Sequence, residues 1–239
     1  MVPTVAVALL ALETLGSADA PSRDELLVEA AAVPDKGTVR LSETGGATPV
    51  ASDGTPGYTV GASIIWSLGA EVAAGFAATN EGGKLTPAAS LRWQLLHQEA
   101  NFLDATGFVR FKSVGFSPAG PEMEAEAAAG RSFGRFRLVV NGVVGTGLSA
   151  QRAVDVELKS AVTWRVSDDV SLGAQAALRQ EVGQEADAVA GGRDRDVIAG
   201  PTCSVQLGDL TVQALAGWGA PRGTAPAGPV AIAQLAVDL

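Results

Sequence analysis

A regular alternation of apolar and polar residues between Val154 and Glu181 constrains this chain more than any other feature. Successive side chains of a β-strand point to opposite faces, so alternation over this length predicts two long strands. The alternation breaks once, at Ser167-Asp168-Asp169, and this break predicts a tight turn between the strands. The segment is therefore expected to form a hairpin with one apolar face and one polar face.

The same period of two recurs along most of the chain. No stretch of comparable length after residue 37 shows a helical period. The recurrence predicts an all-β, antiparallel fold of about 12 strands. The expected strands are 37–44, 58–67, 70–79, 84–97, 102–115, 121–133, 135–148, 154–167, 169–182, 195–207, 209–219 and 229–239.

Composition excludes several classes of partner and site. The chain has 239 residues and a net charge of −9, which disfavours nucleic acid, because phosphate binding needs a surplus of Lys and Arg. Cys203 is the only cysteine, so neither an internal disulfide nor a cysteine metal site can form. After the N-terminus no apolar run reaches about 18 residues, which excludes a helical membrane span. We expect no cofactor.

The first residues have the pattern of an export signal. Val5–Leu12 form an apolar core, and Ala18-Asp19-Ala20 fits a cleavage site of small residues, so Met1–Ala20 is expected to be a cleaved signal peptide. The first basic residue is Arg23, which departs from the usual basic start, and an ordinary N-terminal helix is the alternative. Residues 21–36 are charged and rich in alanine, and we expect a lead-in that is either a short helix or disordered.

Short and longer connections alternate between the expected strands. The short ones lie near Leu68-Gly69, Gln98–Asn101, Gly134, Asp168 and Gly208-Asp209. The longer ones lie at Gly45–Gly57, Asn80–Gly83, Phe116–Gly120, Ala150–Ala153, Gly183–Asp194 and Gly219–Gly228. Transmembrane β-barrels have short periplasmic turns, longer external loops and an even number of strands. If the first strand starts in the periplasm, all six longer loops emerge outside and both termini are periplasmic.

Aromatic residues indicate which face meets lipid. Of twelve aromatic residues, nine fall on the apolar faces of the expected strands, mostly near strand ends. Rings at strand ends with smaller apolar residues between them are typical of two interfacial girdles around a lipid-facing band. The residues expected at the membrane interface are Trp66, Trp93, Phe133, Phe136, Trp164 and Trp218.

The polar faces carry charges deep within strands, and hairpin register can pair them. A loop centred near Ala119 or Pro118 places Lys112 opposite Glu124 and, two residues away on each strand, Arg110 opposite Glu126. Opposed side chains approach within about 4.5–5.5 Å. Pairing is expected in a narrow barrel interior, where unpaired charge is costly. On a water-facing sheet the same pairs would contribute at most about 1 kcal/mol each.

The expected hairpin between Val154 and Glu181 extends this interpretation. A turn at Asp168 places Glu157 opposite Arg179 and Asp155 opposite Glu181. We interpret the charged residues of both hairpins as paired groups of a lumen. This predicted set comprises Arg110, Lys112, Glu124, Glu126, Asp155, Glu157, Arg179 and Glu181.

Over residues 37–239 the strand pattern, the loop asymmetry and a last strand reaching the final residue resemble outer-membrane β-barrel proteins of Gram-negative bacteria. The resemblance implies a single up-and-down transmembrane β-barrel, with the lipid bilayer and the outer-membrane assembly machinery as partners. Proteins of this superfamily usually end on an aromatic residue that serves assembly. This chain alternates correctly from Ala231 to Val237 but ends in Leu239.

Two groups of residues were considered as sites of chemistry. Some twelve-stranded outer-membrane barrels are phospholipases with a Ser/His pair, and His97 is the only histidine, but no serine is marked by its context. We expect His97 to be a polar interfacial residue and the protein not to be an enzyme. Glu122, Glu124 and Glu126 share a strand face and could bind Ca²⁺. We favour them as partners of Lys112, Arg110 and Arg137, with no metal.

The sequence thus predicts a structural outer-membrane barrel or a narrow small-solute channel with a charged lumen. A soluble or periplasmic β-barrel that binds an apolar ligand is the alternative, because alternation alone does not say which face is inside.

Overall fold

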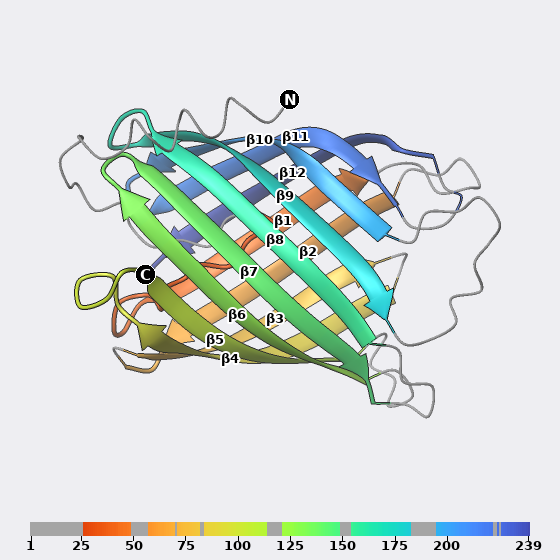
Figure 1. Cartoon of the computed structure of the whole chain (residues 1–239), viewed down its shortest axis with the longest axis horizontal. Helices are drawn as coiled ribbons and strands as arrows, with labels where there is room; N and C mark the ends of the chain where they lie inside the picture. The colour runs from red at the N-terminus through yellow and green to blue at the C-terminus, as the bar shows by residue number, and fades with distance from the viewer. Residues whose placement is uncertain are drawn as a thin grey trace.

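The computed structural model is a closed antiparallel barrel in which each strand pairs with its neighbours in sequence and β1 pairs with β12 (Figure 1). The structure describes residues 26–48, 57–69, 71–81, 84–113, 121–148, 154–182, 195–221, 224 and 226–239. The predicted all-β barrel of about twelve strands is confirmed. The strands are β1 (Val39–Thr48), β2 (Gly57–Ser67), β3 (Val72–Glu81), β4 (Lys84–Leu96), β5 (Asp104–Ser113), β6 (Pro121–Phe133), β7 (Phe136–Gly147), β8 (Val154–Arg165), β9 (Val170–Val182), β10 (Arg195–Leu207), β11 (Leu210–Ala220) and β12 (Gly228–Asp238).

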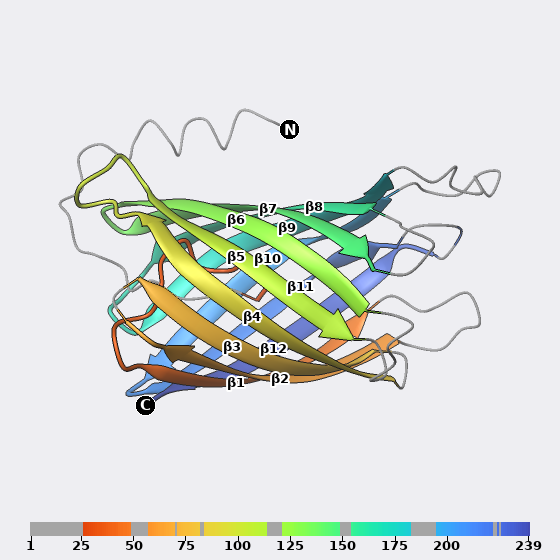
Figure 2. The ribbon, with the colours of Figure 1, turned by 90° about the horizontal axis from the view of Figure 1, so that it is seen from below.

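The five short turns lie at the end of the barrel that also holds the last residue (Figure 2). Two of them are tight because a glycine adopts a positive φ, with Gly134 at 58° and Gly208 at 64°. This conformation is cheap for glycine and strained for other residues. Most residues of the expected longer loops lie outside the described residues.

The strands turn their apolar faces outward. Phe76 on β3 is 64% exposed and Leu158 on β8 is 53% exposed, whereas the inward Asn141 on β7 is fully buried. Arg92, Thr106, Gln175 and other polar side chains are buried inside the barrel. Water-soluble proteins bury apolar groups and expose polar ones, so the distribution here is inverted. Among the described residues no helix is long and apolar enough to cross a membrane.

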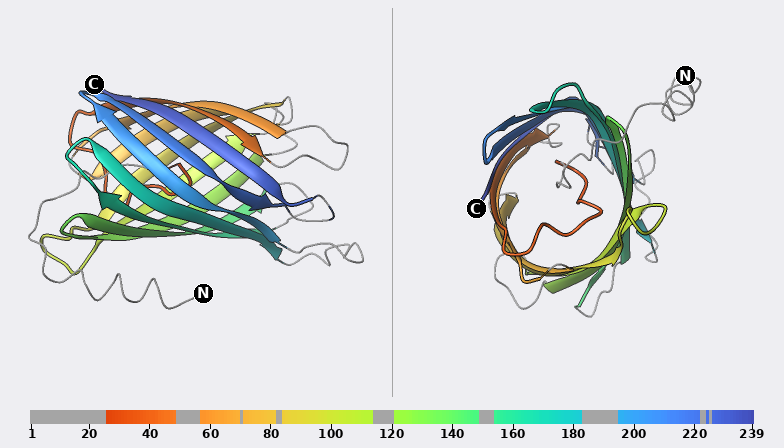
Figure 3. Two further views of the ribbon diagram at one scale, coloured as in Figure 1. Left: turned by 90° about the horizontal axis from the view of Figure 1, so that it is seen from above. Right: turned by 90° about the vertical axis from the view of Figure 1, so that its left-hand side faces the viewer.

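Residues 26–38, here called the lumenal segment, precede β1. The part up to residue 34 lies inside the barrel (Figure 3), and the exposed residues 35–37 form the turn that leads to β1. The lumenal segment includes residues 26–36 of the expected lead-in, and it contains no helix. Val28 and Ala31 are buried against inward side chains of four strands. The wall residues of this contact are Phe108, Ala128, Val139 and Ala161. Residues 21–25 and the expected signal Met1–Ala20 are outside the described residues.

Candidate functional site: a charged lumen containing the N-terminal segment

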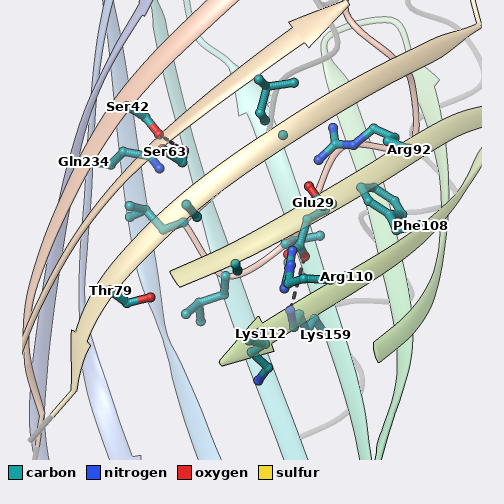
Figure 4. Close-up of a pocket in the computed structure, with 18 of the residues that line it drawn as sticks. Glu29, Ser42, Ser63, Thr79, Arg92, Phe108, Arg110, Lys112, Lys159 and Gln234 are labelled. Atoms are coloured by element: carbon teal, nitrogen blue, oxygen red, sulfur yellow. Dashed lines mark hydrogen bonds and ion pairs between the residues drawn. The ribbon is translucent and has the colours of Figure 1, made fainter. Parts of the chain in front are cut away.

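A cavity of about 520 Å³ lies in the lumen beside the lumenal segment. It is lined by residues 26–29 and by inward side chains from β1 to β6 and β8 to β12. Figure 4 shows Glu29 of the segment among Arg110, Lys112 and Lys159, with small polar side chains from other strands across the cavity. The cavity is therefore polar, and charged along one side.

Glu29 is held by charged and polar groups from three strands. Its Oε1 lies 2.9 Å from Nη2 of Arg110, and its Oε2 lies 3.2 Å from Nζ of Lys159. The Nδ2 of Asn141 donates a hydrogen bond of 3.1 Å to the Glu29 carbonyl oxygen. Burial alone would raise the pKa of Glu29, but the attraction of Lys159 and then of Arg110 outweighs it. The pKa of Glu29 therefore lies below its ordinary value, and the carboxylate stays ionised.

Side chains of the barrel wall also satisfy backbone groups of the lumenal segment. Buried backbone donors and acceptors need partners, and an irregular segment has none of its own. Five strands supply them here, each through one side chain. The bonds are Leu27 N to Gln175 Oε1 (2.8 Å), Val33 N to Gln94 Oε1 (2.7 Å), Thr106 Oγ1 to Ala30 O (3.1 Å), Asn141 Nδ2 to Glu29 O (3.1 Å) and Ser67 Oγ to Pro34 O (3.0 Å).

The β5–β6 hairpin brings the expected charges together in a different register. Arg110 lies opposite Glu124 and Lys112 opposite Glu122, so the expected pairings of Lys112 with Glu124 and Arg110 with Glu126 across the strands are wrong by two residues. The centre of the hairpin moves by one residue, and a shift of two leaves every side chain on its face. Lys112 still reaches both carboxylates, at 3.2 Å from Glu122 and 2.5 Å from Glu124.

Glu126 departs furthest from its expected role. It lies opposite Phe108 in the register and accepts a hydrogen bond of 2.7 Å from Asn141 Nδ2. Arg110 instead contacts Glu29 and Glu124, at 2.9 and 3.3 Å. The expected partner of Arg110 is thus replaced in part by a residue of the lumenal segment.

The β8–β9 hairpin has the expected register, with Glu157 opposite Arg179 and Asp155 opposite Glu181. The contacts do not join opposed residues. Arg179 Nη2 lies diagonally across the hairpin, 2.5 Å from Asp155 Oδ2, and Glu157 Oε2 lies 3.6 Å from Nζ of Lys159 on the same strand. Asp155 and Glu181 are both acidic, so our interpretation of this pair as a charge pair is corrected on chemical grounds. Lys159 was missing from the predicted set, although it joins Glu157 to Glu29.

The predicted interfacial aromatics lie near strand ends on the outer surface. Trp66, Trp164 and Trp218 are exposed there. Phe136 stacks on Trp164 with ring centroids 6.2 Å apart. The ring of Trp93 covers Gly107, where an added Cβ would lie 2.7 Å from it. Phe133 packs beside the guanidinium of Arg131, 4.7 Å from its ring centroid.

Sequence reasoning placed Arg110 in the lumen but missed the other residues that bind the lumenal segment, and it missed Glu29 itself. A signal for Glu29 was present, since it is the single charged residue in the apolar run Leu26–Val33. A lone carboxylate in such a run needs a buried partner if the run is enclosed. Asn141, Gln94 and Gln175 lay on the expected polar faces, but nothing marked them as partners of a backbone.

Of the residues considered for chemistry, His97 lies apart from this network, whereas Glu124 and Glu126 belong to it. His97 is exposed beside the β4–β5 turn, where its carbonyl oxygen accepts hydrogen bonds from Ala100 N and Asn101 N. Within the part of the chain that the structure describes, no group of three or more His, Cys, Asp or Glu residues could hold a metal ion. Glu122 and Glu124 contact Lys112 instead.

Solved structures with a similar fold include porins and an outer membrane channel. The NanC porin matches with a TM-score of 0.65 and 9% identity, over 83% of this chain and 100% of its own. The KdgM porin matches with 0.61 and 6%, over 84% and 99%. An outer membrane channel from Pseudomonas putida F1 matches with 0.59 and 13%, over 93% and 100%. No protein-family model matches the sequence, and no curated protein matches it. The chain thus has the β-barrel fold of outer-membrane porins and channels.

Proposed function

We propose that the chain is an outer-membrane protein whose barrel forms a narrow, charged passage for small solutes. The observation that carries this proposal is the inverted distribution of side chains, apolar outside and polar around a cavity of about 520 Å³. The porin and channel fold of its structural neighbours agrees with it.

The outer surface supports the membrane part of the proposal. Leu91, Val144 and Leu158 point outward from the middle of their strands and are strongly exposed. In water this surface would favour aggregation, whereas in lipid it is the stable arrangement. Closure between β1 and β12 leaves no strand edge unpaired, as the hydrocarbon core requires. Trp66, Trp164 and the other aromatics at strand ends would then lie at the membrane interfaces.

The proposed orientation follows from the export signal and the turns. Chains delivered by a cleaved signal at Met1–Ala20 reach the outer membrane from the periplasm. Short turns are periplasmic in barrels of this kind, so both ends of the barrel domain would face the periplasm. Insertion would depend on the assembly machinery that serves such barrels.

The lumen supports the passage. Six cationic side chains and three carboxylates line the cavity: Arg40, Arg92, Arg110, Lys112, Lys159 and Arg179, with Glu29, Glu122 and Glu157. Most of these charges form ion pairs, which lowers the cost of a charged lumen. A polar solute that crosses here exchanges its water for these groups, as in other charged pores.

Purified protein in planar bilayers tests the passage. We expect discrete unit currents in salt solution and swelling of proteoliposomes in a small polar solute. Strict impermeability to salts and small solutes would rule out the passage and leave a structural barrel. Co-fractionation with outer membranes, together with a mobility on gels that changes on boiling, would support the proposed location.

The soluble barrel with an apolar ligand is the competing function, and the charged lining of the cavity opposes it. Deletion of Met1–Ala20 separates the two, because a soluble protein would stay monodisperse without detergent and a membrane barrel would precipitate. The hypothesis of a lipid hydrolase requires that a His97→Ala variant lose a hydrolytic activity present in the native protein. We expect the native protein to hydrolyse no lipid.

A further inference from the structure

We propose that residues 26–34 are a displaceable plug, bound by the lumen wall as an irregular peptide segment and held in place by the carboxylate of Glu29. In the bound state the plug obstructs the lumen, and its withdrawal opens the barrel. The consequence for solute flow rests on the proposed passage, whereas the binding and release of the plug do not.

The wall binds the plug mainly through its backbone. Side chains of Ser67, Gln94, Thr106, Asn141 and Gln175 bond to its amide and carbonyl groups. Main-chain hydrogen bonds of this kind contribute affinity through groups that every residue carries, and leave selectivity to the side chains. The plug's side chains are small at three successive positions, Ala30 to Ala32, which lets the backbone approach the wall. The lumen wall thus provides polar side chains that match the backbone groups of an irregular peptide segment.

Glu29 is the only charged residue of the plug, residues 26–34. Its carboxylate bridges Arg110 and Lys159, from β5 and β8. Two cations around one carboxylate select an acidic residue at this position, because a neutral or basic side chain would leave both without this partner. Glu29 therefore determines both the position of the plug and the class of peptide that the site accepts.

The wall retains charge partners when the plug leaves. Arg110 also lies 3.3 Å from Glu124, and Lys159 lies 3.6 Å from Glu157. Withdrawal of Glu29 therefore strands neither cation in a poorly hydrated space. A plug whose removal left buried charges unpaired would be a permanent part of the core.

The plug is also mechanically separate from the barrel. It precedes β1, so its withdrawal breaks no strand pairing. A turn closed by the hydrogen bond from Thr38 N to Asp35 O (3.0 Å) links it to β1, and Gly37 within this turn has a φ of +87°. Glycine at this position allows the chain to change direction. The turn is a natural hinge for the plug.

The plug and the wall approach most usefully for mutagenesis at Gly130, where a substitution would affect the plug directly. A Cβ added at Gly130 on β6 would lie 2.9 Å from Cβ of Ala31. A larger side chain at residue 130 therefore competes with Ala31 for the same space. At Gly142 on β7 an added Cβ would meet no atom within 4 Å, which makes it the matched control.

The first experiment measures access to the plug in the full-length protein in vesicles. A Cys203→Ser, Ala31→Cys background is labelled with a membrane-impermeant maleimide. We expect slow labelling, at least about tenfold faster after Glu29→Lys or Gly130→Leu, because either change removes the buried environment that suppresses thiol reactivity. Glu99→Gln, in the exposed β4–β5 turn, and Gly142→Leu should leave the rate unchanged.

The second experiment locks the plug. Ala31→Cys with Gly130→Cys in the Cys203→Ser background should form a disulfide, since bridged Cβ atoms are about 3.8 Å apart and a shift of about 1 Å reaches this value. In planar bilayers the oxidised protein should show no openings, and a reductant should restore them.

The outcomes separate the two proposals. Equal labelling rates in the native, Glu29→Lys and Gly130→Leu backgrounds would overturn the plug. So would openings that are equally frequent in the oxidised and reduced forms of a double variant that conducts. Labelling that responds as expected in a protein that never conducts would instead reject the passage and retain a displaceable plug.

Discussion

The lumen has two unlike walls. The charged wall, β5 to β9, carries acidic and basic side chains that form ion pairs with one another; they include Arg110, Lys112, Glu122, Glu124, Asp155, Glu157, Lys159 and Arg179. The neutral wall, β11, β12 and β1 to β3, carries hydroxyls and amides along most of its length; they include Ser42, Thr44, Ser63, Thr79, Thr211, Gln213 and Gln234. Arg40 and Asp238 form a charged pair on this wall, at the short-turn end.

This difference between the walls explains how the plug is held in the lumen. Glu29 contacts only strands of the charged wall in its ion pairs, and Val28 and Ala31 pack against the same strands. The neutral wall lines the cavity on the other side, where Ser42 and Ser63 bond to each other at 2.7 Å. The charged wall therefore supplies the ion pairs and the apolar contacts that hold the plug. The neutral wall bonds to it through Ser67, near the short-turn end, and otherwise borders the remaining space.

The largest expected effect is on the charged wall. Lys159→Met should lower the free energy of unfolding by about 3 kcal/mol, because it leaves the buried Glu29 with one cation instead of two. Urea denaturation in detergent micelles measures this loss. Ser63→Ala on the neutral wall is the comparison, with at most about 1 kcal/mol expected. Equal losses for both variants would contradict the assignment of different roles to the walls.

The next effect tests the uncharged part of the plug site. Asn141→Leu removes the donor to both the Glu29 carbonyl and the Glu126 carboxylate, and should destabilise the protein by about 1–3 kcal/mol. Gln234→Leu removes one bond to Thr44 on the neutral wall and should cost about 1 kcal/mol or less. The same denaturation assay applies. An effect of Gln234→Leu as large as that of Asn141→Leu would weaken the comparison.

These residues also explain what the sequence could predict. The β8–β9 register was correct because the turn at Ser167–Asp169 is too short to allow another. The β5–β6 register was wrong by two because residues 114–120 join the strands and impose no single centre. The lumen faces were assigned correctly in both hairpins, since the alternation is insensitive to a shift of two.

The plug could not be predicted from periodicity. Residues 26–38 follow no strand or helix period. The wall binds their backbone groups through Gln, Asn and Thr side chains, which are common residues on a polar strand face. Such contacts exist only after the barrel has brought β4, β5, β7 and β9 around one space. The information lies in the closed wall rather than in the segment.

A smaller effect concerns ion selectivity. Ser63→Lys places an isolated cation on the neutral wall and should shift the reversal potential in a KCl gradient towards anions, because this wall has few charges to compensate it. Lys112→Gln on the charged wall should shift it less, since Glu122 and Glu124 lie beside it and rearrange with it. A greater shift from Lys112→Gln would reverse our assignment of the two walls.

The smallest effect expected is that of lowering the pH on the frequency of plug openings. The pKa of Glu29 lies below its ordinary value, so its contribution is complete above that value and is lost only as pH falls towards the lowered pKa. Plug openings in planar bilayers should therefore remain rare from pH 7 to about 5 and increase only below about 4. The groups facing Glu29 are Arg110, Lys159 and Glu126. Frequent openings already at pH 6 would show that Glu29 is not the controlling group.

The Arg40–Asp238 pair joins the first strand to the last by two hydrogen bonds, at 2.6 and 2.9 Å. The two residues lie opposite each other in the β1–β12 register, and backbone bonds between Val39 and Leu239 finish the seam beside them. If this seam closed one residue out of step, one of the two charges would turn outward into hydrocarbon. The pair therefore favours one register of the closing β1–β12 pairing over the registers shifted by one residue.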